Sequence, residues 1–368
     1  MTIPEFQSPN EIDIDALVAQ ICVVKQRRSE DTIHIVTVTP LVAITDVHDA
    51  LQSRAHAAGL TVYVRGTSQP NELELSYTVG LPPATTTRPF LALGLLLATI
   101  VSCLAAGALY QGVDIVQYPW QLAAGIPFAA TILGILATHE LGHYIVGKRW
   151  DAPVSLPYFI PLPPPLSFTG TMGAVIVQRE PMRNRRVLFD VGLAGPIAGL
   201  CVAVPLLFYG LSLSTVAPPP SGGYMQEGNS AFYILAKLIM FGRILPADNL
   251  DVQLSDVAFA AWIGLLVTMF NLLPIGQLDG GHVAYAVFGR YAHYVAYGAI
   301  GFCVLLGVFV DNTWLVWGVI ATFANPRHPA PYDDVTPIGS WRILMACLTF
   351  VVLLFLLTPV PIRVVMPT

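Results

Sequence analysis

The sequence HELGH at residues 139–143 contains the side chains with the most specific chemistry in the chain. On a helix, His139 and His143 lie one turn apart on the same face, which is the spacing at which two imidazoles bind one zinc ion. Glu140 lies beside them, where its carboxylate can take a proton from an attacking water. The motif therefore predicts half of a zinc site together with its general base.

The same motif lies inside an apolar stretch, residues 122–146, that is long enough to cross a bilayer. Three ionisable groups within five residues are costly in lipid, so a functional role is the default interpretation of such residues. The elements that position them are therefore expected to be membrane helices.

Composition supports a membrane protein. The 368 residues are 55% hydrophobic and 11% charged, whereas a soluble domain has about 25% charged residues. Residues 1–88 hold 16 of the 41 charged residues, which predicts a small soluble domain followed by a membrane domain. The net charge of −5 and the lack of a basic cluster with interleaved aromatic residues argue against a nucleic-acid partner.

The predicted domains are a small α+β domain at residues 1–80, a linker at 81–88 and a membrane-embedded domain at 89–368. In the first domain, alternating apolar residues predict three strands and helical spacing predicts one helix. The strands are expected at 31–39, 60–65 and 72–79, and the helix at 46–58. No chemical motif occurs there, and its partner is not indicated. Residues 1–10 are polar, which predicts that no signal peptide is present.

The membrane domain is predicted to be polytopic and α-helical, with about six spans. We place these spans at 89–110, 121–147, 187–212, 256–274, 291–310 and 341–360, and leave 231–242 and 313–325 as short spans, re-entrant pieces or interfacial helices.

The connection at 147–186 contains six Lys and Arg residues, and that at 111–120 contains none. The positive-inside rule therefore predicts that the N-terminus and the HELGH motif face the cytoplasm.

A catalytic zinc takes about three protein ligands, so the two histidines need a third. Asp279 is the best candidate, because Pro274 and nearby glycines end a span just before it and it falls at the same predicted depth as the motif. His282 is a weaker alternative, more typical of a supporting or surface residue. Asp190 is expected to cap a helix or to pair with a nearby arginine.

The connection between the second and third spans is apolar and irregular. Residues 156–166 are proline-rich and cannot form a regular helix, and 168–177 are typical of a glycine-kinked strand or hairpin. An unpaired strand beside a membrane could receive an extended peptide by strand addition. The alternative is a loop that only caps the membrane domain, and the sequence favours neither.

HELGH together with Asn271-x-x-Pro274-x-x-x-Leu278-Asp279-Gly280 closely resembles the site-2 protease family of intramembrane zinc metalloproteases, over residues 89–340. The resemblance is to members without a PDZ domain, from bacteria, cyanobacteria and chloroplasts. It implies zinc (Zn2+) bound by His139, His143 and Asp279, with Glu140 as the general base. It also implies a substrate-binding role for Asn271 and for the strand that contains Gly170, Thr171, Met172 and Gly173.

The resulting hypothesis is a zinc metalloendopeptidase that cleaves single-span membrane proteins within the bilayer, in a bacterial plasma membrane or a thylakoid-type membrane. The alternative of another class is a catalytically idle membrane scaffold or binding protein on the same fold. A transporter is disfavoured because no inverted repeat is evident. A zinc protease with a glutamate as third ligand is disfavoured because no span after HELGH contains Glu.

Overall fold

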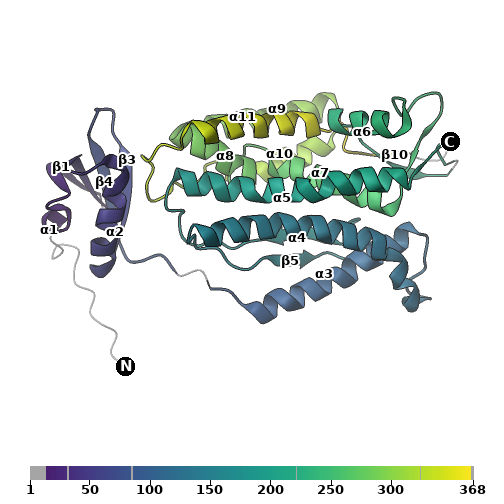
Figure 1. The fold of residues 1–368 in the computed structure, drawn as a ribbon, viewed down its shortest axis with the longest axis horizontal. Coiled ribbons are helices and arrows are strands. Elements are labelled where there is room, and N and C mark those ends of the chain that lie inside the picture. Colours follow the sequence, from purple (N-terminus) through teal and green to yellow (C-terminus); the bar gives the residue numbers. More distant parts are fainter. Residues whose placement is uncertain (1–13, 31–32, 84–85, 221, 324, 366–368) are drawn as a thin grey trace.

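The computed structural model describes residues 14–30, 33–83, 86–220, 222–323 and 325–365. Residues 1–10, 31–32 and 84–85, on which parts of the predictions above fall, lie outside the described residues. A small sheet domain lies at one end of an elongated helical bundle (Figure 1).

The N-terminal domain is a four-stranded antiparallel sheet in the order β1-β2-β4-β3, with a helix packed against β3. The three predicted strands and the predicted helix are confirmed, and Gly59 ends the helix with φ +70°. The sequence did not predict β1, which pairs with β2 at the edge of the sheet. The elements are α1 (Ile14–Val18), β1 (Cys22–Glu30), β2 (Ile33–Pro40), η2 (Ile44–Asp46), α2 (Val47–Ala57), β3 (Leu60–Gly66) and β4 (Leu73–Val79).

The membrane domain is a bundle in which α5 packs against α4, α7 and α8. Its helices are α3 (Pro89–Tyr110), η3 (Pro119–Gly125), α4 (Ile126–Arg149), α5 (Arg185–Ser212), α6 (Ala231–Phe241), α7 (Asp256–Asn271), α8 (Asp279–Phe288), η4 (Gly289–Tyr291), α9 (Ala292–Phe309), α10 (Thr313–Phe323) and α11 (Ser340–Leu356). Its short strands pair as β5 (Tyr158–Pro161) with β6 (Thr171–Val175), β7 (Thr215–Ala217) with β9 (Asp251–Gln253), and β8 (Tyr224–Glu227) with β10 (Ile362–Val365).

Four segments in the described part of the chain are long and apolar enough to cross a membrane: 89–110, 119–149, 185–212 and 279–309. Two predicted spans correspond to shorter apolar helices, α7 with 16 residues and α11 with 17, and a span needs about 20. Helix α7 ends at Asn271 because Pro274 follows. The protein is thus a polytopic helical membrane protein, and the count of six spans stays a prediction.

The sheet domain is joined to the bundle by the segment between α10 and α11. The Val64 N–H donates to the Tyr332 carbonyl over 2.8 Å, and the Asp334 N–H donates to the Val64 carbonyl over 3.0 Å. Asp333 forms a second parallel bridge with Asn184, the residue that caps α5. Residues 332–334, hereafter the bridging segment, therefore connect the edge strand β3 to the start of α5.

The buried carboxylate of Asp333 holds the turn that follows the bridging segment. Its Oδ1 accepts hydrogen bonds from the Val335 and Thr336 N–H groups at 2.9 and 3.0 Å, and Oδ2 accepts one from the Thr336 hydroxyl. We predict that Asp333→Ala destabilises the full chain by about 1–3 kcal/mol, because buried donors lose their acceptor. Asp333→Asn keeps the Oδ1 acceptor and should lose less. Thermal unfolding in detergent checks this, and equal melting temperatures for both variants would contradict it.

Candidate metal centre and active site

Three side chains from two helices meet at one point inside the bundle. His139 and His143 lie near the C-terminal end of α4, and Asp279 begins α8 after the turn that follows α7. The Nε2 atoms of the two histidines are 3.1 Å apart, and each lies 3.2 Å from one carboxylate oxygen of Asp279. All three side chains are largely buried, and together they could hold a metal ion.

The spacing and protonation of these atoms fit a zinc ion. Ligands of a tetrahedral zinc at about 2.0–2.1 Å lie roughly 3.3 Å from one another. Nδ1 of His143 is 2.7 Å from the Val191 carbonyl, so it donates to that carbonyl and leaves Nε2 free to bind a metal. Oδ2 of Asp279 is buried without a hydrogen-bond donor in the described chain, although it lies beside His139. A cation between these atoms would satisfy all of them.

A glycine on α5 makes room for the His143 ring. A Cβ placed on Gly195 would lie 2.1 Å from Nε2 of His143, a distance that no side chain can tolerate without displacing the ring. Gly142 allows the same close approach from the other side, since its Cβ would lie 2.6 Å from the Ala194 carbonyl. The small residues of α5 thus set the position of the imidazoles on α4.

A cavity of about 240 Å³ opens beside the three ligand side chains. Glu140, predicted as the general base, is buried and lines this cavity, as does Asn271. The side-chain nitrogen of Asn271 is 3.5 Å from Nε2 of His139. The cavity therefore brings a carboxylate and an amide to the edge of the metal site, where a peptide carbonyl could bind.

The β5–β6 hairpin forms one wall of the cavity. Residues 174–176 and Gln178 line it. The four residues predicted to bind substrate, 170–173, lie earlier on the same hairpin: Thr171 is buried, Met172 is exposed, and Gly170 packs against α3 with φ +79°. Their role in substrate binding stays a prediction, and the structure places the next residues of β6 closer to the metal site.

Two further arrangements involve residues that the sequence placed less well. Asp190 forms a bidentate ion pair with Arg342 of α11 at 2.7 Å, whereas the nearby arginines were expected as partners. His282 lines the cavity and its Nδ1 lies 2.6 Å from Nε2 of His328. The glycine turn before His282 hinted at a supporting role, but nothing in the sequence pointed to His328 as its partner.

The fold and site define a polytopic membrane protein in which a His-His-Asp group that could hold a metal ion lies beside a glutamate. Residues 127–308 match the model of peptidase family M50 and form an M50 (site-2 protease) domain. This confirms the resemblance drawn from the two motifs.

The curated relatives are chloroplast proteins of plants. The chain is 32% identical over 253 residues to "Probable zinc metalloprotease EGY1, chloroplastic" of Arabidopsis thaliana, which covers 66% of this chain and 44% of the relative. It is 30% identical over 251 residues to the EGY2 protein of Oryza sativa subsp. indica, covering 65% and 44%. The chain thus spans less than half the length of these relatives. No solved structure matches it significantly.

We predict that Gly195→Ala lowers the metal content of the purified full chain, because the new methyl group displaces the His143 ring. Gly199→Ala on the same helix gives a graded comparison: its Cβ would lie 3.3 Å from His139, so that ring must move by only a few tenths of an ångström and the loss of metal should be smaller. Gly134→Ala on α4, whose Cβ would meet nothing within 4 Å, should leave the metal content unchanged. Elemental analysis measures all three, and a Gly195→Ala protein with full metal content would refute this packing argument.

Proposed function

We propose that the protein is an intramembrane zinc metalloendopeptidase that hydrolyses peptide bonds of single-span membrane proteins. The observation that carries the proposal is the meeting of His139, His143 and Asp279 beside Glu140 in a cavity of an M50 domain. The names of the curated relatives support zinc as the metal. The idle-scaffold alternative has no support, because the ligands and the base are all present.

The residues of the cavity have distinct roles in the proposed reaction. His139, His143 and Asp279 hold the ion. Zinc, when bound, lowers the pKa of water towards neutrality and polarises a carbonyl. Glu140 takes the proton of the attacking water and returns it to the nitrogen of the leaving amine. Asn271 donates its amide N–H to the carbonyl oxygen of the scissile bond.

A transmembrane substrate must unwind before cleavage, because a helix hydrogen-bonds its own amides. We infer that the segment directly after β6, at residues 176–178, receives the unwound segment. The N–H and C=O of Val177 both face Ser155, with distances of 2.9 and 3.1 Å. In extended backbone the N–H and C=O of successive residues face opposite edges, so we infer that those of Ile176 face away from Ser155, and Ile176 lines the cavity.

We also propose an orientation. The C-terminal end of α4, the start of α5 and the sheet domain lie at the same end of the bundle (Figure 1), and Lys148, Arg149, Arg185 and Arg186 belong to these two helix ends. The positive-inside rule makes that end cytoplasmic. A bacterial plasma membrane or a thylakoid-type membrane is the proposed location, and the lipid bilayer and single-span proteins are the proposed partners.

Replacing the base should separate metal binding from catalysis. We predict that Glu140→Gln retains about one zinc per chain but cleaves a single-span test substrate at least about 100-fold more slowly, since general-base catalysis is lost. Asp279→Ala should lose both zinc and activity, because it removes a ligand. Zinc analysis and a cleavage assay in detergent check both variants. If Glu140→Gln cleaved the substrate at the wild-type rate, Glu140 would not be the general base.

This proposed pairing edge can be tested through the backbone of Ile176, which directly follows β6. We predict that Ile176→Pro lowers kcat/KM for the same substrate about tenfold, because proline removes an N–H that pairs with the substrate. Ile176→Val keeps the N–H and a similar side chain and should cleave at nearly the wild-type rate. Zinc content should be normal in both variants. Equal kcat/KM for the two would mean that the substrate does not pair with this edge.

A further inference from the structure

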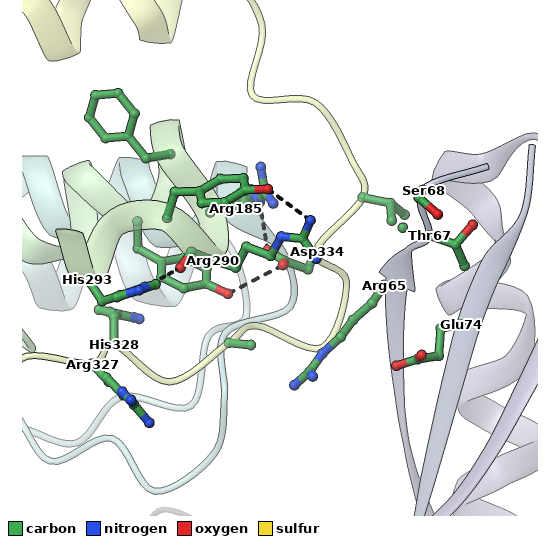
Figure 2. A pocket seen from close by; sticks show the side chains of 17 residues that line it. Arg65, Thr67, Ser68, Glu74, Arg185, Arg290, His293, Arg327, His328 and Asp334 are labelled. Carbon is green, nitrogen blue, oxygen red and sulfur yellow. Dashed lines mark hydrogen bonds and ion pairs between the residues drawn. The ribbon is translucent and has the colours of Figure 1, made fainter. Parts of the chain in front are cut away.

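A second and larger cavity lies between the sheet domain and the helical bundle. Its volume is about 1240 Å³. One wall is the β3–β4 end of the sheet, and the other is formed by the end of α8, η4 and the chain between α10 and α11 (Figure 2). The bridging segment runs along it through Asp334. The cavity is distinct from the one beside the metal centre, and none of the proposed catalytic residues lines it.

Four arginines line this cavity against two carboxylates. The arginines are Arg65, Arg185, Arg290 and Arg327, and the carboxylates are Glu74 and Asp334. Arg185 is neutralised by Asp334 at 2.6 Å. The other charged side chains of the lining are three arginines and one glutamate, so the cavity carries a net positive charge.

Arg290 donates to the Tyr291 hydroxyl over 2.9 Å, which leaves Arg65 and Arg327 as the arginines of the set without a side-chain partner in the described chain. Within the described residues, neither guanidinium forms an ion pair or a side-chain hydrogen bond. Figure 2 shows them on opposite sides of the space between the sheet domain and the bundle. Glu74 is the cross-strand neighbour of Arg65, but no ion pair joins the two side chains in the described chain. Two unpaired guanidinium groups facing one cavity form a site for an anion with several acceptor oxygens, because each offers a fork of N–H donors.

The other lining groups narrow the chemistry of the anion. Ser68 adds a hydroxyl donor to the wall that carries Arg65, whereas the Thr67 hydroxyl donates within its own turn to the Gln69 and Glu72 carbonyls. Burial lowers the pKa of His328 to about 3, so its ring is neutral and adds no charge. Phe288 and Tyr291 are exposed at the rim, and aromatic rings beside arginines are typical of the membrane–water interface.

We propose that this cavity binds a phosphate-bearing anion between Arg65 and Arg327, either the headgroup of an anionic phospholipid or a soluble phosphate. Tetrahedral phosphate oxygens suit guanidinium and hydroxyl donors arriving from opposite sides. The ligand would join the sheet domain to the bundle through one arginine from each wall. This site is independent of the proposed peptidase activity.

The test uses the purified full chain and two probes. Inorganic phosphate is titrated by calorimetry in neutral detergent at constant ionic strength. Phosphatidylglycerol is measured as lipid retained, by native mass spectrometry, after extraction from nanodiscs of phosphatidylcholine with phosphatidylglycerol. We expect wild-type protein to bind at least one probe, and Arg65→Gln/Arg327→Gln to bind it at least about tenfold more weakly. The probe that binds identifies the source of the phosphate.

Two controls separate the site from general charge and from folding. Arg363→Gln removes an exposed arginine of β10 at the opposite end of the molecule and should bind like wild type (Figure 1). Arg327→Gln alone changes an exposed loop residue and should fold normally and still weaken binding. Zinc content should be unchanged throughout, so a failure here leaves the peptidase proposal standing. Absence of binding to wild type, or equal binding by wild type and the double variant, overturns the proposal.

Discussion

The helical domain depends on burying three ionisable side chains at one point of an apolar bundle. His139, His143 and Asp279 lie within about 3.2 Å of one another, and such a cluster is tolerable only when opposite charges and a bound cation compensate its desolvation. The close contact of α4 with α5 makes this possible. Gly142 and Gly195 remove the side chains that would separate the helices or displace an imidazole. The position of the metal site is thus a consequence of helix packing.

Much of this site could be predicted from the sequence, because ionisable residues are rare within apolar segments and each one there carries information. The i, i+4 histidines defined one face of a helix, and the helix-breaking residues before Asp279 placed a carboxylate at matching depth. The strands of the sheet domain were predictable for a similar reason, since alternation identifies a half-buried strand. Strand β1 was not predicted, because Lys25, Arg27 and Arg28 interrupt the apolar alternation, as is typical of a charged edge strand.

The rest depends on contacts between distant parts of the chain. Arg342 pairs with Asp190 from 152 residues away, and His328 reaches His282 from 46 residues away. No local pattern indicates either partner, because a single Arg or His has many uses. The pairing of the bridging segment with β3 could not be predicted either, because it uses backbone groups, which every residue possesses. Span number is hard to predict for the same reason, since α7 is short but buried by its neighbours.

The bridging segment also gives the molecule a mechanical property. Val64, Asp333 and Asn184 are joined side by side through backbone pairing, and Asn184 caps the helix that carries Val191 and Gly195. A pull on the N-terminal sheet would therefore load hydrogen bonds that lead to the first turn of α5, about two turns before the carbonyl that orients His143. The sheet domain is thus attached to the helix that packs against the imidazoles, and tension applied to the sheet would be transmitted along α5 to the candidate metal site.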